Sequence, residues 1–357
     1  MIWSPIELTY HVRSYGFGER LIPDVLGKKD APDGIVAETW EISDQRDAIA
    51  TITRGPLSGQ TLHEAVQAHP EEIVGQGWSG PHFPLLAKFL DASHMLPVHL
   101  HASDLVAQEK YGEPNGKTEA WHILWAAPDT TILAGVKPDL SREALTDAFM
   151  RQDYDEVMYR YPISAGDTVY VPGGSLHSFG PDTLIYEIQQ TSDLSQNVMP
   201  ADLFGSPYSP EQWSANIAAV LDELENDYLP KPNPGLARKN GQSTITVGCA
   251  SKYFALERWT VAAPISIPKD GRHCWLISNV GERPVTIRWG AGGGLGLARA
   301  SSVLIPAAID GWSVAPYLGE GSVVVSYVPD LETDIIAPLR EAGHSDEAIA
   351  ALGHVFS

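Results

Sequence analysis

Two histidines separated by one residue, in a segment of alternating side chains, constrain this chain more than any other feature. The segment reads Pro97-Val98-His99-Leu100-His101. In an extended strand, residues two apart point to the same face. His99 and His101 are therefore predicted to share one face, while Val98 and Leu100 pack on the other. The pattern favours a β-rich fold with a metal site on the inner face of a strand.

Two later segments add side chains of the same chemical kind. Glu119 precedes a strand-like run from Trp121 to Trp125, and His177 follows a Pro-Gly-Gly turn after the alternating run Thr168 to Val171. Three imidazoles and one carboxylate suit a borderline divalent ion that keeps coordination positions open for a substrate. The predicted metal ligands are His99, His101, Glu119 and His177.

The chain is long enough for two domains and has the turn residues of a β protein. It has 357 residues, with 32 glycines and 27 prolines, as expected for many short strands joined by turns. The clearest linker is the proline-rich segment around Pro230 to Pro234. We predict a metal-binding catalytic domain with helical insertions at 1–228, a linker at 229–242, a second, metal-free β-barrel domain at 243–330 and a C-terminal helical tail at 331–357.

Three segments within the first half are predicted to be helices that lie outside the strand framework. The first runs from Leu62 to Val74, with Thr61 as its N-cap. The second covers 141–154, where Leu145, Phe149 and Met150 fall on one stripe. The third begins at the cap Ser209, has proline at its first helical position and runs to about Asp227.

Charge and composition exclude several classes of partner. Acidic residues outnumber basic ones by 45 to 24, a net charge of −21, which argues against binding to nucleic acid or to an anionic membrane. The two cysteines, Cys249 and Cys274, are expected to be buried free thiols rather than a disulfide framework. No leader-like start and no apolar stretch of about 18 residues is visible. We therefore expect a cytoplasmic monomer or homodimer.

The spacing of these residues resembles the cupin superfamily. Gly166, Pro172, Gly174 and His177 fit its G-x5-P-x-G-x2-H signature at every fixed position. The other signature, H-x-H followed by Glu, is present with a longer loop, which is similar to that of the type I mannose-6-phosphate isomerases. The segments E-T-W-E-I-S at 38–43, G-K-T-E at 116–119 and E-I-Q-Q-T-S-D at 187–193 also resemble that family, as does the approach to the metal strand at 83–92.

The resemblance implies a fold and an activity. The fold is mainly β, with two cupin-like jelly-roll barrels and peripheral helices. The activity is that of a metal-dependent aldose–ketose isomerase acting through an enediol. We expect Zn²⁺ as the cofactor and a small sugar or sugar phosphate as the substrate, either mannose 6-phosphate, which gives fructose 6-phosphate, or a related sugar that need not be phosphorylated.

Four residues are candidates for contacts with the substrate. Lys117 lies two residues before Glu119, so it can face the same cavity as an acid, a base or a binding group, or it can pair with Asp104 or Glu113 instead. Glu187 and Asp193 stand at positions that match carboxylates of the family, and they are candidates for moving protons or for orienting water, although Glu187 could instead be a buried orienting group. The candidate substrate-binding residues are Lys117 and Asn197, which stands where the resemblance implies an arginine that stabilises negative charge.

Two other functions fit the same residues. A non-catalytic sugar-binding or regulatory cupin would keep the metal site without the chemistry, and the change at Asn197 is compatible with that. A redox cupin would use Fe(II) or Mn(II), which also suit three histidines and a carboxylate. His99 could also lie beside the metal ligands without binding the metal itself, because the family usually has a glutamine at this position.

Overall fold

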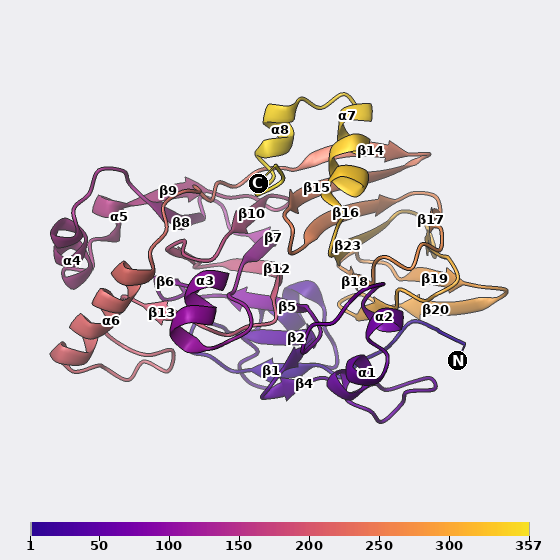
Figure 1. The fold of residues 1–357 in the computed structure, drawn as a ribbon, viewed down its shortest axis with the longest axis horizontal. Coiled ribbons are helices and arrows are strands. Elements are labelled where there is room, and N and C mark those ends of the chain that lie inside the picture. The colour runs from indigo at the N-terminus through magenta and orange to yellow at the C-terminus, as the bar shows by residue number, and fades with distance from the viewer. Residues whose placement is uncertain (1, 357) are drawn as a thin grey trace.

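The first half of the chain forms two antiparallel sheets that face each other. The computed structural model describes residues 2–356 (Figure 1). One sheet has the order β1 (His11–Arg13), β2 (Glu38–Ile42), β5 (Leu85–Ala92), β12 (Thr183–Gln190), β7 (Glu119–Ala126) and β10 (Thr168–Val171). The other has the order β13 (Gln196–Asn197), β6 (His99–Leu100), β11 (His177–Phe179), β8 (Thr131–Val136) and β9 (Met158–Pro162). A two-stranded ribbon, β3 (Asp44–Gln45) and β4 (Ala48–Ile49), lies beside them.

The second half of the chain repeats this arrangement with a second pair of sheets. One has the order β14 (Leu236–Asn240), β15 (Ser243–Ala250), β16 (Ala255–Val261), β23 (Gly321–Tyr327), β18 (Trp275–Asn279) and β21 (Ser302–Ile305). The other has the order β17 (Ile265–Ile267), β22 (Trp312–Pro316), β19 (Val285–Trp289) and β20 (Gly293–Leu297). The fold is thus mainly β, as the sequence predicts, with one cupin-like barrel in each half (Figure 1).

The predicted linker at 229–242 is partly wrong, because strand β14 occupies Leu236–Asn240 within it. The strand pairs with β15 through a two-residue turn, in which Asn240 faces Ser243 and Gly241 has a φ of 59°. The two central residues of this turn are Gly241 and Gln242, and glycine at the first of these positions is typical of a type II′ hairpin turn, which requires positive φ there. Strand β14 therefore already belongs to the six-stranded sheet of the second half.

The helices lie outside the sheets, as predicted, but the three expected in the first half all end early, and the one expected at 141–154 ends at Met150. The helix expected at 62–74 is broken at His69 into α1 (Leu62–Ala68) and α2 (Pro70–Ile73), because a proline cannot continue the hydrogen-bond ladder. The helix expected to reach Asp227 is α6 (Pro210–Glu223). The remaining helices are η1 (Ile22–Leu26), α3 (Asp104–Val106), η2 (Ala107–Tyr111), α4 (Arg142–Met150), α5 (Tyr154–Val157), η3 (Leu331–Ile336), α7 (Ala337–Glu341) and α8 (Asp346–Ala350).

The predicted N-caps of these helices are present, but one of the predicted buried stripes is only partly buried. Thr61 and Ser209 accept hydrogen bonds from backbone N–H groups three residues later, as N-caps do. In α4, Leu145 and Phe149 are buried, but Met150 is 40% exposed, so it does not belong to the packed stripe. A residue next to Phe149 in sequence lies about 100° around the helix and faces solvent.

One hydrophobic core runs through both halves of the chain. The same cluster of buried residues contains Leu62 and Phe89 from the first half and Cys249, Leu276 and Val324 from the second. The predicted burial of both cysteines as free thiols is confirmed. The two halves therefore stabilise each other through shared apolar contacts.

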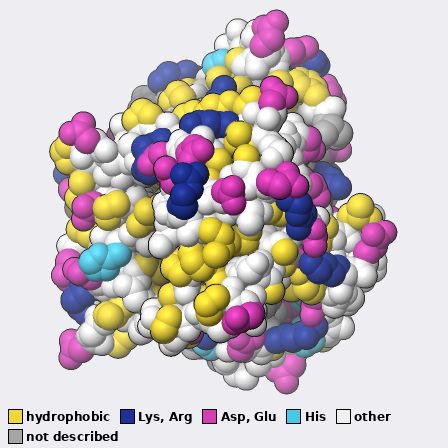
Figure 2. Space-filling model, turned by 90° about the vertical axis from the view of Figure 1, so that its left-hand side faces the viewer, with side chains coloured by type: hydrophobic (Ala, Val, Ile, Leu, Met, Phe, Trp, Pro, Cys, Tyr) yellow, Lys and Arg dark blue, Asp and Glu magenta, His cyan; other side chains and the backbone are white. Residues whose placement is uncertain are grey.

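The outer surface at the end that carries α4 and α6 is mixed in character. Figure 2 views this end and shows apolar side chains gathered in its centre, with acidic and basic side chains interspersed around them. Within residues 2–356, no helix is long and apolar enough to cross a membrane.

Candidate metal centre and substrate cavity

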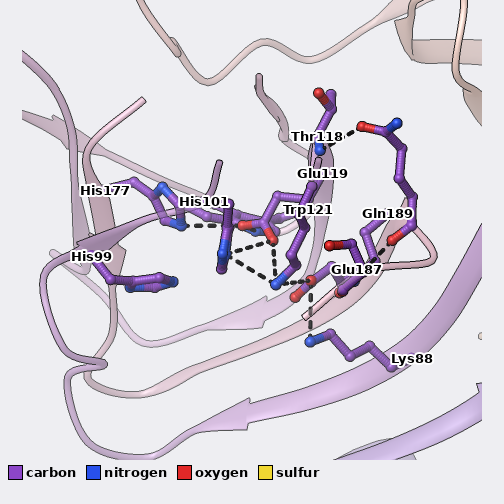
Figure 3. A network of polar contacts seen from close by, with 12 residues as sticks. Lys88, His99, His101, Thr118, Glu119, Trp121, His177, Glu187 and Gln189 are labelled. Carbon is purple, nitrogen blue, oxygen red and sulfur yellow. Dashed lines mark hydrogen bonds and ion pairs between the residues drawn. The ribbon is translucent and has the colours of Figure 1, made fainter. Parts of the chain in front are cut away.

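The two segments with the predicted metal ligands meet inside the first barrel. Strand β11 pairs with β6 so that His177 lies directly opposite His99. His101 follows two residues later on the same face. One ring nitrogen from each histidine lies within 4.8 Å of the others, and the rings of His99 and His177 are 4.2 Å apart. The alternation in the sequence thus places three imidazoles around one point (Figure 3).

Glu119 reaches this point from the opposite sheet, at the start of β7. Its Oε1 lies 3.2 Å from His177 Nε2, and its Oε2 lies 3.3 Å from His101 Nε2. The indole of Trp121 donates a hydrogen bond of 2.8 Å to Oε1 and fixes the carboxylate. All four predicted ligands are therefore together, each 9% exposed or less.

Hydrogen bonds to the backbone settle which ring nitrogen of each histidine faces the centre. In all three rings, Nδ1 lies at hydrogen-bond distance from a carbonyl oxygen, which can only accept, so Nδ1 carries the proton. The lone pair is then on Nε2, as in metal-binding histidines whose other nitrogen donates to a carbonyl. The acceptors of His99, His101 and His177 are the carbonyls of Pro97, Leu194 and Ser175, at 2.7, 2.9 and 2.9 Å.

The charge states of the same groups suit a cation. Burial lowers the pKa of His99 well below its usual value, and burial followed by the charge of Lys117 lowers the pKa of His101 to about 3. Burial opposes ionisation of Glu119, but Lys117 and His101 lower its pKa well below normal. Glu119 Oε2 and His177 Nε2 are buried and make no hydrogen bond. Neutral His99 and His101, an ionised Glu119 and buried atoms left without a hydrogen bond together fit a divalent metal.

Lys117 extends into this cluster, as its position two residues before Glu119 predicts. Its Nζ lies 3.0 Å from Glu119 Oε2 and donates a hydrogen bond of 3.0 Å to His101 Nε2. Its side chain is only 6% exposed. The lysine is therefore within reach of any group bound beside the metal set.

The two alternative partners of Lys117 are engaged elsewhere. Asp104 accepts a hydrogen bond of 2.6 Å from the hydroxyl of Tyr253, and Glu113 pairs with Arg46 at 3.1 Å. The interpretation of Lys117 as a residue of the cavity is the one that the geometry supports.

Behind Lys117 lies an ion pair between Glu187 and Lys88, of which only Glu187 was predicted from the sequence. Glu187, on β12, lies 3.7 Å from Lys117 Nζ and 3.2 Å from the Nζ of Lys88, on β5. Burial, followed by the charge of Glu119, raises the pKa of Glu187 to about 8. Burial alone would lower the pKa of Lys88, but Glu187 and Glu38 raise it. The available signal was a single lysine inside a buried apolar strand, where an unpaired charge would be very costly.

The metal set opens onto a cavity of about 320 Å³, within the size range of small-molecule sites. Lys117, Asp193 and Asn197 line it, so three of the four candidate substrate residues share one wall, and Glu187 lies behind them. Burial raises the pKa of Asp193. Sequence reasoning missed the aromatic part of the wall, formed by Tyr15, Phe17, Trp40, Phe204 and Tyr208.

Asn197 faces the metal strand. It pairs with His99 across β13 and β6, and its side-chain oxygen accepts a hydrogen bond of 3.1 Å from the backbone N–H of Met199. The side chain therefore has a structural contact in addition to its place on the wall.

Comparison with known proteins agrees with this geometry. Mannose-6-phosphate isomerase ManA of Bacillus subtilis (strain 168) is 33% identical over 239 residues, 67% of this chain and 74% of its own length. Mannose-6-phosphate isomerase of Streptococcus mutans serotype c is 27% identical over 301 residues, 84% of this chain and 90% of its own length. No protein-family model matches the chain.

A solved structure extends the likeness to nearly the whole chain. The crystal structure of the mannose 6-phosphate isomerase from Bacillus subtilis superposes with a TM-score of 0.79 at 25% identity, covering 91% of this chain and 99% of that one.

Proposed function

The chain belongs to the mannose-6-phosphate isomerase family, and we propose that it interconverts mannose 6-phosphate and fructose 6-phosphate, or a closely related pair of sugars, in the cavity beside the metal set. Such a reaction moves a proton between C1 and C2 of the sugar through an enediol. The observation that carries the proposal is the buried set of three imidazoles and one carboxylate, with Lys117 in contact with two of these four side chains.

We propose zinc as the resident metal and His99, His101, Glu119 and His177 as the residues that hold it. Nitrogen ligands with one carboxylate suit zinc and leave room for oxygens of the substrate. When bound, the ion would act as a Lewis acid that stabilises negative charge on the oxygens of C1 and C2.

The side chains around the set are proposed to handle the proton. Lys117 donates a hydrogen bond or a proton to a substrate oxygen, because its ammonium group contacts two of the proposed metal ligands, His101 and Glu119. Asp193, on the cavity wall with its pKa raised by burial, takes the proton from one of the two carbons, C1 or C2, and returns it to the other. Glu187, with a pKa raised to about 8, exchanges a proton with Lys117 at 3.7 Å and so resets its charge.

The assay that tests this function compares substrates and metal states. We expect the purified protein to form fructose 6-phosphate from mannose 6-phosphate, with solvent deuterium appearing in the product during NMR in D₂O. A chelator should abolish the reaction and zinc should restore it. A metal-loaded protein that exchanges no proton in mannose 6-phosphate or free mannose would overturn the isomerase proposal and favour a sugar-binding cupin.

Three further expectations from the sequence stay predictions. They are the cytoplasmic location, the monomeric or dimeric state and the lack of nucleic-acid partners. The division of the chain near residue 228 also remains a proposal, supported by the separate sheets on either side of it.

A further inference from the structure

The inner face of the six-stranded sheet carries a row of alternating charges that begins at the metal set. Lys117 joins Glu119 to Glu187, with Nζ at 3.0 and 3.7 Å from the two carboxylates. Lys88 then joins Glu187 to Glu38, at 3.2 and 3.5 Å. Each lysine thus stands between two carboxylates, and both ammonium charges are compensated before any substrate enters.

Arg13 is the next cation along this row, on the edge strand β1. It lies directly opposite Glu38 in the register of β1 and β2, and residues opposite each other on antiparallel strands share a face. Its guanidinium carbon is 4.4 Å above the ring of Trp40, whose indole donates a hydrogen bond of 2.6 Å to Glu38. Stacking on the ring orients the planar guanidinium and leaves its edge available.

The charge of Arg13 is weakly compensated, in contrast to the two lysines. Its ion pair is with Asp47 at 3.7 Å, and the side chain of Asp47 is 69% exposed, so the pair contributes little. Arg13 Nε is buried and makes no hydrogen bond. A buried donor without an acceptor is costly, and an anionic group brought to the guanidinium would relieve that cost.

Arg13 also lies close enough to the cavity to act on its wall. Trp40 and Glu38, which it faces, both line the cavity. Burial raises the pKa of the Asp193 carboxyl, and the charge of Arg13 is among those that oppose this rise. The residues that line the cavity, all within the described part of the chain, include Lys88 and Lys117 but no arginine.

We propose that Arg13 binds the phosphate group of the substrate and so selects phosphorylated over free sugars, an inference that rests on the proposed isomerase function. The phosphate lies at the other end of the six-carbon chain from C1 and C2. A sugar whose reacting end lies at the histidines therefore needs its phosphate-binding cation at the far end of the row, where Arg13 stands. A guanidinium binds phosphate oxygens bidentately.

The test compares three variants on two substrates. R13M keeps the apolar stem over Trp40 and removes the charge, whereas R13K keeps a charge without the bidentate geometry. R46M is the matched control, because Arg46 is 81% exposed, pairs with Glu113 and flanks a neighbouring cleft. Kinetics with mannose 6-phosphate and free mannose are combined with calorimetric binding of mannitol 6-phosphate, which cannot isomerise.

We expect R13M to raise the KM for mannose 6-phosphate by about tenfold to a hundredfold, the effect of losing charge-assisted hydrogen bonds. Binding of mannitol 6-phosphate should weaken by the same factor, R13K should recover part of the loss, and R46M should resemble the parent. Circular dichroism and the melting temperature confirm that each variant is folded.

The outcomes separate this inference from the proposed function. An unchanged KM in R13M, or an equal loss for mannose 6-phosphate and free mannose, would overturn the role of Arg13. If the parent isomerises neither sugar, the proposed function fails. The affinity for mannitol 6-phosphate then tests the role of Arg13 separately. A weaker affinity in R13M supports the phosphate site, and an affinity equal to that of the parent refutes it.

Discussion

The two barrels contain the same local device in different surroundings. In the first, Trp121 on β7 donates its indole N–H to Glu119, two residues before it, at 2.8 Å. In the second, Trp259 on β16 donates to Glu257 in the same way at 2.5 Å. Both carboxylates are buried inside a barrel. Only Glu119 has histidines and a lysine around its remaining lone pairs.

The surroundings of Glu257 are aromatic. The hydroxyl of Tyr327 donates to Glu257 at 3.1 Å, and the ring of Trp275 lies 4.1 Å from that of Tyr327. Trp312 stacks on Trp259 with centroids 6.0 Å apart. Aromatic rings therefore surround Glu257, whereas imidazoles and a lysine surround Glu119. A buried carboxylate on a strand gives chemistry only where its neighbours leave donor atoms unpaired.

The largest expected difference is between the same substitution in the two barrels. E119Q removes the charge that the proposed metal needs, so we expect isomerase activity to fall by about a thousandfold, with loss of bound metal. E257Q should retain activity and metal. Steady-state kinetics and metal content by plasma emission measure both. Comparable losses in both variants would show that the two carboxylates are not functionally distinct.

The second contrast concerns stability. W275A removes a ring from the packed aromatic cluster, and we expect a loss of about 3–5 kcal/mol in the free energy of unfolding. Because Trp275 is not among the residues that line the cavity, we expect kcat of the folded variant to change by less than a factor of about three. Urea denaturation and kinetics at 25 °C give the two values. A large fall in kcat for protein that is still folded would mean that the second barrel shapes the site.

The third contrast tests the tryptophan that orients each carboxylate. W121F removes the hydrogen bond to Glu119, and losing such a supporting contact typically weakens metal binding by about tenfold to a hundredfold. W259F should leave metal affinity unchanged. Competition with a chromophoric chelator measures the affinity. Equal affinities in W121F and W259F would argue that Glu119 needs no support from the indole.

The smallest effect is a pH dependence in the second barrel. Burial raises the pKa of Glu257, although Arg238, Trp259 and Tyr327 oppose this. The protonated form is therefore favoured in the folded state. The contribution of Glu257 to the free energy of unfolding is complete below its pKa in the unfolded chain, about 4.3, and is lost as the pH rises through its pKa in the folded protein. The loss is about 1.4 kcal/mol for each unit by which the two pKa values differ.

E257Q cannot titrate, so its stability relative to the parent should improve as the pH rises above about 4.3. Urea denaturation at several pH values measures this difference. A difference that stays constant with pH would mean that Glu257 titrates normally in the folded protein.

Strand alternation could predict which ligands meet, and long-range pairing explains what it missed. His99 and His101 share a face because of a period of two, and the turn before His177 returns the chain beside them. The contacts of Lys88 depend on β5 lying between β2 and β12, strands far apart in sequence. No local pattern encodes that order.

The second barrel shows the same limit. The sequence predicts strands there and no metal set, but the strand Leu236–Asn240 lies within the predicted linker, directly after its prolines. The aromatic part of the cavity wall could not be predicted from the sequence either. Tyr15 and Phe204 meet with ring centroids 6.0 Å apart, although 189 positions of chain order separate them, which only the tertiary fold can reveal.

The hydrophobic core that both barrels share couples their stabilities. Phe89 of the first half and Leu276 of the second belong to one buried cluster, so neither barrel can open without exposing apolar surface of the other. Any ligand that binds only the folded first barrel must then raise the melting temperature of the whole chain. Metal bound at the histidines of the first barrel would thus also stabilise the second barrel and its aromatic cluster.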